Sequence, residues 1–444
     1  MVGLMVPLIM MILNIAMFGV ALPTVRDNFG INADVVAWLI TAFSLPYVIF
    51  MPIFGRLGDG LGKRRLLLIG ISIFLVGTVI TLTAAELPSL IMGRVVQGIG
   101  AASVDPLCLA IIAELFPAQQ WGKSMSVWSS GAPAATMVGF VLSGLMVDYL
   151  GWRTIFVPVL LVGIMALIAV RGWVPMNPVR VESGFWRVLD WVGMILLSAA
   201  ITLMVFYISS RPITGVAVLA DWRLLFISLA LFGTFIFWEK RQTLPFISMD
   251  IFAARNFSLA SLEAATRMFV LSSLLFLAPL YLTDVRGLSP TLIGILVMLH
   301  AAALLLTVRT GGPLGDRWGD RRMVIISPAI QVGMMSLLAL LPQTAPLGLI
   351  VFALVGNGFG AGLSLVPLNR FAMRRTRSAQ RGMAAGLFSM IRFTGVVLGP
   401  AVGGVLLQAR LDQSAVEIEA YQAIFWIIAG IALLGVILGW RLHE

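Results

Sequence analysis

Long apolar stretches, separated by short polar connections, follow one another along the whole chain. Each stretch is about 20 residues long, which is the length that a helix needs to cross the hydrocarbon of a bilayer. Charged residues or clusters of Gly and Pro interrupt the pattern between them. The pattern predicts fourteen membrane-spanning helices, at residues 2–22, 35–54, 66–85, 88–114, 123–147, 152–171, 190–209, 222–238, 257–282, 288–308, 323–342, 346–368, 383–408 and 421–440.

Composition agrees with this reading. Of the 444 residues, 60% are hydrophobic and only 11% are charged, so a water-soluble fold could not bury the apolar surface. The first apolar stretch runs from Met1 to Pro23 without a small-residue cleavage pattern, and it is therefore interpreted as the first span rather than as a signal peptide. The sequence predicts an all-α polytopic membrane protein.

The formal charge of +10 raises the question of a nucleic-acid partner. The basic residues are dispersed in short clusters between apolar spans, which argues against one. With an even number of spans, most of the 30 Lys and Arg residues fall on the side that holds both termini. The positive-inside rule then places both termini in the cytoplasm of a cell membrane, most simply a bacterial inner membrane.

Two connections repeat one another at a constant offset of 257 positions. Each reads Gly-x-x-Gly-Asp-x-x-Gly-x-basic-basic, one after the second span and one after the tenth. Glycines let helices approach closely, and we expect the two aspartates to meet basic side chains across the seam between two halves, closing that side. This conformational latch comprises Gly55, Asp59, Gly62, Arg64, Gly312, Asp316, Gly319 and Arg321.

Further repeats are displaced by 260 positions. Gly98 and Gly100 match Gly358 and Gly360, and a small-residue run in the fifth span matches one in the thirteenth. Small residues allow close helix packing in membranes, and such repeats are expected of transporters built from two related halves. The expected helix-packing residues are Gly139, Gly144, Gly399, Pro400, Gly403 and Gly404.

The repeated connection resembles the signature of the major facilitator superfamily. Ala21-Leu22-Pro23, the Arg94-x2-Gln97 pair and the run from Asp148 to Arg153 resemble its fourteen-helix drug:proton antiporter (multidrug efflux) branch. The resemblance implies a major facilitator fold with two pseudo-symmetric six-helix bundles, at 1–171 and 257–444. Two extra transmembrane helices lie in a linker at 172–256.

Two departures from that branch bear on proton coupling. The branch places an aspartate in the first helix where this chain has Asn14, which cannot exchange a proton near neutral pH. A Gly-Pro pair expected in the fifth span is here Gly139-Phe140. Asn14 has two interpretations: it makes a structural polar contact, or it contacts the cargo.

Ionisable residues within spans are functional candidates because burying a charge in a bilayer is costly. The proton-coupling candidates are Asp105, Arg94 and Glu263. Asp105 precedes Pro106, which can unwind the helix; the alternative to a coupling role is a buried carboxylate tied to a helix neighbour. The resemblance implies a coupling role for Arg94, with a structural role as a hydrogen-bond hub as the alternative. Glu263 stands four residues before Arg267, so we expect an intrahelical ion pair, with a titrating Glu263 as the alternative.

Four further polar residues are candidates for the substrate cavity: Asn14, Gln97, His300 and Arg392. A single histidine on an apolar helix is more often a packing residue, which remains the alternative for His300. Arg392 matches an arginine that the resemblance places in the thirteenth helix.

These features predict a secondary transporter that exports hydrophobic or amphipathic small molecules by proton antiport through alternating access. The alternatives are a lipid, siderophore or metabolite exporter with weak or no proton coupling, and a non-transporting membrane receptor or scaffold. With two histidines and sparse acids, no catalytic set or metal site can be assembled, so we expect no enzyme, no metal and no cofactor. Expected partners are the small-molecule substrate, the proton and membrane lipids, with a periplasmic adaptor as an open alternative.

Overall fold

The computed structural model describes residues 1–116, 121–175, 190–210, 220–242, 249–374, 381–413 and 416–442. Within these ranges the regular structure is α-helix with two short 3-10 turns. Fourteen helical segments are long and apolar enough to cross a membrane, which confirms the number of spans expected from hydropathy. Parts of the expected linker at 172–256 lie outside the described residues.

The helices of the first part of the chain extend beyond the apolar stretches that predicted them. Polar residues such as Arg26 therefore lie on helix ends and not in loops. The bounds are α1 (Val2–Phe29), α2 (Ala33–Leu61), α3 (Lys63–Leu82), α4 (Leu87–Ala101), α5 (Val104–Leu115), α6 (Trp121–Leu150), the 3-10 turn η2 (Trp152–Ile155) and α7 (Phe156–Trp173).

Two helices follow that pack on each other as a hairpin, and the rest of the chain forms a second group. The hairpin consists of α9 (Trp191–Ser209) and α11 (Trp222–Glu239). The second group comprises the 3-10 turn η3 (Met249–Ala253), α12 (Arg255–Asp284), α13 (Pro290–Trp318), α14 (Asp320–Leu340), α15 (Leu347–Leu363), α16 (Leu365–Met373), α17 (Arg381–Leu411) and α18 (Glu417–Trp440).

Two of the fourteen spans are interrupted near their middle. The span at Leu87–Leu115 is α4 followed by α5, and the span at Leu347–Met373 is α15 followed by α16. Proline has no backbone N–H and its ring clashes with the preceding turn. In the first of these spans the break falls just before Pro106, which leaves Asp105 in the first turn of α5.

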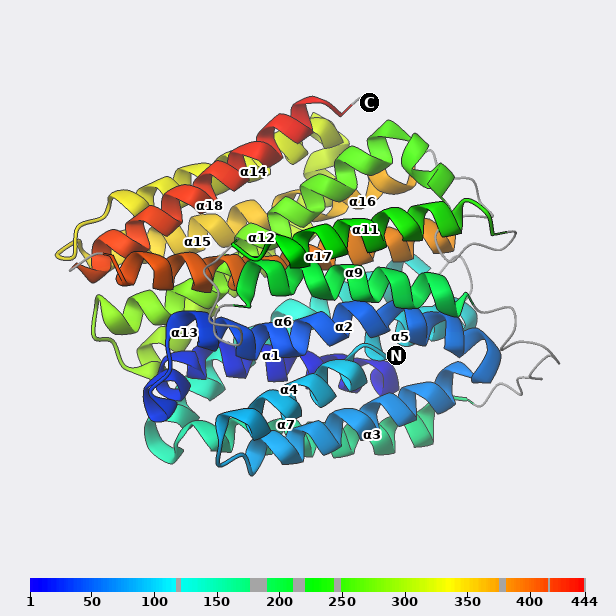
Figure 1. Cartoon of the computed structure of the whole chain (residues 1–444), viewed down its shortest axis with the longest axis horizontal. Coiled ribbons are helices and arrows are strands. Elements are labelled where there is room, and N and C mark those ends of the chain that lie inside the picture. Colours follow the sequence, from blue (N-terminus) through cyan, green and yellow to red (C-terminus); the bar gives the residue numbers. More distant parts are fainter. Residues whose placement is uncertain are drawn as a thin grey trace.

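The helices of α1–α7 pack mainly on one another, and so do those of α12–α18. Contacts between the two groups concentrate on two pairs, α2 with α17 and α6 with α13. In Figure 1 the helices run roughly parallel to the long axis, with the first group at the bottom and the second at the top. We call the surface where the two groups meet the seam.

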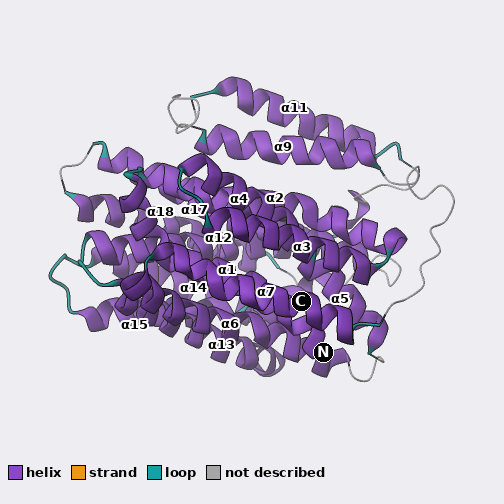
Figure 2. Ribbon diagram, turned by 90° about the horizontal axis from the view of Figure 1, so that it is seen from below, coloured by secondary structure: helices purple, strands orange, loops and turns teal. Residues whose placement is uncertain are grey.

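The hairpin covers one side of this assembly. Both α17 and α2 contact α9, and Figure 2 shows α9 and α11 as a separate layer on the face away from α6 and α13. A hydrogen bond from the Trp38 indole to the Ser209 backbone oxygen attaches α2 to the end of α9. Among the described residues, the pair of α2 and α17 therefore has a second layer of helix over it, and the pair of α6 and α13 has none.

Because neighbouring helices are antiparallel, the seam has two distinct ends. The turns at Gly62 and Gly319 lie at one, which we call the Lys63 end. The ends of α1, α6 and α12 and the starts of α2 and α13 lie at the other, which we call the Asp284 end.

Candidate functional site

The guanidinium of Arg94 is the centre of a buried polar cluster in the first group of helices. Its Nη1 donates to Asn14 Oδ1 at 3.3 Å and to Gln97 Oε1 at 3.0 Å, and its Nε donates to the Leu39 backbone oxygen at 3.2 Å. The side chain is 2% exposed, and its guanidinium carbon lies 4.2 Å from the Phe18 ring centroid and 4.7 Å from that of Phe43. All of these partners are neutral.

The cluster continues from Gln97 into α3. The amide nitrogen of Gln97 donates to Thr78 Oγ1 at 3.1 Å and to Thr81 Oγ1 at 3.3 Å, so both ends of this amide are paired. The amide nitrogen of Asn14 is buried without a hydrogen-bond partner. Two of the candidate cavity residues, Asn14 and Gln97, are thus hydrogen-bonded to the same arginine. The sequence had not identified Thr78 and Thr81 as members of this cluster.

Asp105 does not join this cluster but meets a tyrosine. Tyr47 on α2 donates its hydroxyl to Asp105 Oδ2 at 2.5 Å. The Tyr47 ring stands edge-on to the Phe393 ring of α17, with centroids 5.3 Å apart, and the Arg392 guanidinium lies 4.8 Å from the Phe393 centroid. This set spans the seam from α5 through α2 to α17.

The sequence predicted a single uninterrupted span at 88–114 that contains both Arg94 and Asp105. The break between α4 and α5 separates them, and their hydrogen-bond partners differ. Tyr47 and Phe393 were missed because nothing in a single sequence distinguishes them from other aromatic residues in apolar spans.

The ion pair expected between Glu263 and Arg267 is not formed. Both carboxylate oxygens of Glu263 are buried without a hydrogen-bond partner, and the side chain is fully buried. Arg267 instead donates from Nη1 to the Ala361 backbone oxygen at 2.9 Å, while its Nε and Nη2 are unpartnered. Arg267 points toward α15, so its spacing of four residues from Glu263 did not determine its hydrogen-bond partner.

Other polar residues of the second group are also buried with open hydrogen-bonding positions. His300 accepts or donates at Nδ1 to the Leu354 oxygen at 2.9 Å, and its Nε2 has no partner. The amides of Gln331 and Asn357 are both fully buried with neither atom paired. These groups surround α15, because an added Cβ on Gly358 would meet His300 and one on Gly360 would meet Gln331.

The two repeated connections form tight turns at the Lys63 end. Gly62 and Gly319 have φ angles of 94° and 91°, a region that side chains disfavour, which explains the glycine at each. Gly55 approaches Pro106, and Gly312 approaches Val366.

The aspartates of these turns pair within their own group of helices. Lys63 lies 3.5 Å from Asp59 and also contacts Glu114 at the end of α5. Arg370 of α16 contacts Asp316 at 2.6 Å and Asp320 at 3.2 Å. The contacts expected across the seam from Asp59 and Asp316 are thus replaced by contacts that fasten each turn to the interrupted span of the same group.

The basic residues of the latch bind helix ends. Arg64 donates to the Arg171 backbone oxygen near the end of α7, and Arg321 donates to the Trp440 oxygen at the end of α18, at 2.6 Å. Carbonyl groups at a helix C-terminus are unpaired and carry partial negative charge, so a guanidinium is favourable at both positions.

The expected packing glycines lie where helices approach one another closely. A Cβ on Gly139 would meet Ala16 and one on Gly144 would meet the Pro290 backbone. On α17, Gly399 faces Phe269, Pro400 follows it within the helix, Gly403 faces Phe276 and Gly404 faces Ala37. Gly144 lies where α6 contacts α13, and Gly404 lies where α17 contacts α2, so each of the two helix pairs at the seam has one of these glycines at its contact.

Polar contacts hold the seam together at the Asp284 end. Arg26 makes two hydrogen bonds to the Asp284 carboxylate, at 2.6 and 2.7 Å, and the Tyr421 hydroxyl donates to the same carboxylate at 2.5 Å. The sequence led us to expect closure at the Lys63 end. The structure is closed at the opposite end.

Two more contacts at this end repeat each other. Asp148 Oδ2 accepts from the backbone N–H of Thr291 at 2.8 Å, and Gln408 Oε1 accepts from the backbone N–H of Ala33 at 3.0 Å. Each side chain lies at the end of one group's helix and caps the start of a helix in the other group. Asp148 and Gln408 are 260 positions apart, so the two contacts are equivalent in the internal repeat.

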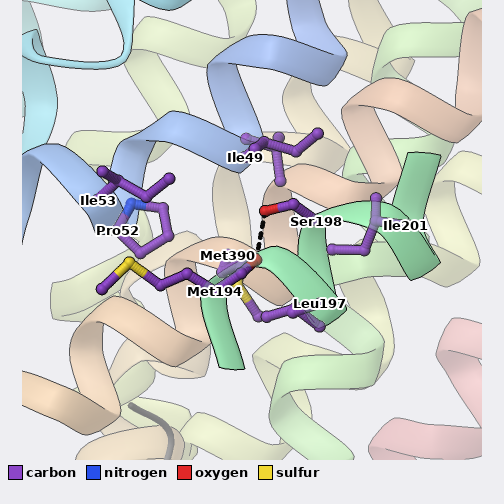
Figure 3. A pocket seen from close by; sticks show the side chains of 9 residues that line it. Ile49, Pro52, Ile53, Met194, Leu197, Ser198, Ile201 and Met390 are labelled. Atoms are coloured by element: carbon purple, nitrogen blue, oxygen red, sulfur yellow. Dashed lines mark hydrogen bonds between the residues drawn. The ribbon is translucent and has the colours of Figure 1, made fainter. Parts of the chain in front are cut away.

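A small pocket lies where the hairpin meets the seam. Figure 3 shows Ile49, Pro52 and Ile53 of α2 facing residues of α9, with Met390 of α17 beside them. Ser198 is the one hydroxyl that lines it, and this hydroxyl donates to the Met194 backbone oxygen at 2.6 Å. The lining is otherwise apolar, so this pocket suits an acyl chain or tight packing more than a polar cargo.

No group of three or more His, Cys, Asp or Glu side chains in the described part of the chain could hold a metal ion. The polar clusters offer hydrogen bonding, charge and a carboxyl group that can carry a proton. They offer no arrangement of nucleophile and base.

Comparisons with known proteins place this geometry in context. The family model described as Major Facilitator Superfamily matches residues 4–259 and 259–444. The chain is 27% identical over 431 residues to "Riboflavin transporter RibZ" of Clostridioides difficile (strain 630), covering 95% of this chain and 92% of the relative. It is 28% identical over 407 residues to "Multidrug resistance protein Stp" of Mycobacterium tuberculosis (strain CDC 1551 / Oshkosh), covering 91% and 75%.

Among solved structures, the crystal structure of a D-xylose-proton symporter superposes with a TM-score of 0.74. It covers 100% of this chain and 97% of the other at 14% sequence identity. At that identity the likeness concerns the fold alone.

Proposed function

Because this chain belongs to the major facilitator superfamily and is a multi-pass membrane transporter, we propose that it exports hydrophobic or amphipathic small molecules in exchange for protons. The proposed movement is alternating access, in which the bundles at 1–171 and 257–444 rock against each other about a central site. The two helices in the linker at 172–256 accompany them.

One observation carries the proposal: the carboxyl group of Asp105 lies at the seam, hydrogen-bonded to Tyr47, whose ring contacts Phe393 of the other group. An antiporter needs a group that holds either a proton or the cargo and that each side of the membrane can reach in turn. A carboxyl group between the two moving bundles meets that need. The helix-1 aspartate of the branch is absent, and Asp105 takes over its role.

The other candidates receive different roles. Arg94 lies among neutral partners with its Nε and Nη1 donors engaged, which favours a structural hub over a proton carrier. Glu263 has two open oxygens in the second group and serves as a second proton site. Asn14, Gln97, His300 and Arg392 line the path of the cargo.

The charge distribution supports an orientation with both termini in the cytoplasm of a bacterial inner membrane. The Lys63 end then faces the cytoplasm and the Asp284 end faces outward. The closed Asp284 end corresponds to a transporter that takes up cargo from the cytoplasm. Relatives named as multidrug resistance proteins and a drug efflux pump support export as the direction.

A second candidate function is export of a metabolite with weak proton coupling. The similarity to a protein named as a riboflavin transporter favours it, as does Asn14 in place of an acid beside Arg94. A flavin-like cargo, with an aromatic ring system and polar edges, fits the aromatic and amide groups of the first polar cluster.

Transport from proteoliposomes with an imposed pH gradient tests the proposal. We expect the gradient to drive accumulation of a fluorescent amphipathic cation by the wild type, and Asp105→Asn to lose gradient-driven accumulation while retaining downhill exchange. Glu263→Gln is the parallel test in the second group, and Arg309→Gln, at an exposed position of α13, is the control. If the wild type moves riboflavin and ignores the gradient, the second candidate replaces the first.

A further inference from the structure

We propose that Arg94 and Asn14 form a binding site for an anionic group, so that amphipathic anions belong to the cargo of this transporter. The site is the space beside Arg94 Nη2 and Asn14 Nδ2, which we call the anion site. The inference rests on the proposed function and deepens it, because it assigns a charge to one part of the cargo. Arg94 remains the centre of its cluster, and the ligand binds at the side of the guanidinium that the described residues leave open.

Two neighbouring hydrogen-bond donors lack an acceptor. Arg94 uses Nε and Nη1 for its three hydrogen bonds, and Nη2 makes none to a described residue. Because a guanidinium can only donate, Asn14 presents its oxygen to Nη1, which leaves the amide nitrogen as its open end. That nitrogen is buried and has no partner. Both open groups are donors, so the ligand that completes them is an acceptor.

The anion site is formed before any ligand arrives. The Phe18 and Phe43 rings pack against the guanidinium of Arg94, with centroids 4.2 and 4.7 Å from its central carbon. These rings and the bonds of Nε and Nη1 hold the guanidinium in one orientation, which fixes the direction of Nη2. A preformed site loses little free energy to ordering when it binds. The first group can therefore take up an anion without rearranging.

The charge of Arg94 has no counter-ion among the described residues. The nearest acids along the chain are Glu86, which is exposed before α4, and Asp105, which is bonded to Tyr47 beyond the break between α4 and α5. A buried guanidinium without a counter-charge is costly. A water molecule satisfies open donors but leaves the charge unbalanced, whereas an anionic oxygen does both. The arrangement therefore favours an anionic ligand over water.

The internal repeat indicates that the fold does not need this charge. Leu354 of α15 lies 260 positions after Arg94, and both side chains are 2% exposed. His300, the equivalent of Phe43, contacts the backbone oxygen of Leu354. An apolar side chain thus fills the same place in the second group. A guanidinium at one of two equivalent places points to a ligand and not to a requirement of the framework.

A line of aromatic rings leads from the anion site to the seam. Phe43, which packs on Arg94, stacks on Tyr47 with ring centroids 6.2 Å apart and 10° between the planes. Tyr47 stands edge-on to Phe393 of α17 at 5.3 Å. Such rings bind aromatic and apolar bodies. The ligand that fits is a molecule with an aromatic body and one anionic group, such as an aromatic sulfonate or carboxylate.

Binding to the purified protein in detergent tests the anion site without transport. The probes are 1-naphthalenesulfonate and 1-naphthalenesulfonamide, which share a ring system and differ in charge, titrated by calorimetry in gluconate buffer. We expect the wild type to bind the sulfonate about 10-fold more tightly, because hydrogen bonds between charged groups contribute more than those to a neutral group. Equal affinities for the two probes overturn the inference.

Asn14→Asp supplies the counter-charge from within the chain. Its carboxylate replaces the amide oxygen that lies 3.3 Å from Arg94 Nη1, so we expect the preference for the sulfonate to disappear while the midpoint of thermal unfolding stays at or above that of the wild type. Asn369→Asp, exposed on α16, adds the same charge elsewhere and should keep the preference. Arg94→Gln, with Arg309→Gln as its control, removes the cation and should also abolish the preference. A preference that survives in Asn14→Asp, or that is lost in the controls as well, contradicts the site.

Two sources of the anion, cargo and a resident inorganic ion, are separated with the same material. Chloride is titrated against the bound sulfonate, and the release of preloaded sulfonate from proteoliposomes is followed by its fluorescence. Release faster than from protein-free liposomes, and lost in Asn14→Asp, assigns the site to cargo. If chloride displaces the sulfonate and no release occurs, the site holds an inorganic ion and the assignment to cargo is wrong.

The same measurements distinguish this inference from the proposed function. Sulfonate binding and release that ignore an imposed pH gradient support the anion site and contradict the proton exchange. Gradient-driven transport of the amphipathic cation, with no binding of the sulfonate, contradicts the anion site alone.

Discussion

The first and second groups of helices place polar residues at equivalent positions but treat them differently. Gln97 in α4 is paired at both ends of its amide, whereas Asn357, its equivalent 260 positions later, is paired at neither. Phe43, which packs on Arg94, corresponds to His300, whose Nε2 is open. The same framework therefore carries a network with one buried open position, the Asn14 amide nitrogen, in the first group, and several buried polar side chains with open positions in the second.

The difference indicates a division of labour. A satisfied buried network stiffens a bundle, because each member is needed by its neighbours. Buried polar atoms without partners are costly unless water, an ion or a ligand completes them. We therefore expect the first group to keep one arrangement while the second group takes up water, protons or cargo groups during transport.

The largest effect should come from breaking the network of the first group at its centre, Arg94. Arg94→Ala removes three hydrogen bonds and two aromatic contacts, and it leaves the Asn14 and Gln97 oxygens unpaired. We expect the free energy of unfolding to fall by roughly 3 kcal/mol, measured as a lower midpoint of thermal unfolding in detergent. A midpoint equal to that of the wild type would show that the cluster is not a structural hub.

A matched pair at equivalent positions sharpens the comparison. Gln97→Ala deletes bonds to Arg94, Thr78 and Thr81, whereas Asn357→Ala deletes an amide that has no partner. We expect Gln97→Ala to destabilise the protein by about 2 kcal/mol more than Asn357→Ala does. Equal losses in thermal unfolding would mean that Asn357 has partners as firm as those of Gln97.

The smallest effect concerns the turns at the Lys63 end, where the two halves use opposite charges. Lys63 at the start of α3 pairs with Glu114, while Asp320 at the start of α14 pairs with Arg370. We expect Lys63→Glu to lower the unfolding free energy by about 0.2–1 kcal/mol and the added Glu114→Lys to restore it, because such partly exposed pairs are weak. If the double variant has the same unfolding free energy as the single variant, then stability depends on which position carries the positive charge and not only on the presence of a pair.

Hydropathy and repeat spacing were enough to predict much of the fold. Fourteen apolar stretches were recognisable because a bilayer demands a fixed length, and the repeats at Gly62 and Gly319 were recognisable because the two connections match at a constant offset. The positive φ angle at each position explains why both are glycine. Arg94 and Gln97 could be paired because they are one turn apart on a single helix.

The contacts between helices were beyond reach of the sequence. Tyr47 and Asp105 are 58 positions apart, and their contact depends on how α2 and α5 are rotated about their axes. Helix rotation also explains why the prediction of a Glu263–Arg267 ion pair was wrong. In the packed helices the Arg267 guanidinium donates to a backbone oxygen of α15 instead. The site residues as a whole stay predictions until transport is measured.

The hairpin of α9 and α11 has a consequence for whatever is dissolved in the bilayer around the protein. At the pair of α6 and α13, a lipid or an oily solute meets the joint between the two halves directly, while at α2 and α17 it meets another layer of helix first. The two halves are related by an internal repeat, yet the two sides of the seam, at α6–α13 and at α2–α17, thus differ in what they expose to lipid. Any solute that reaches the centre sideways, through the membrane and not through water, has one flank by which to enter.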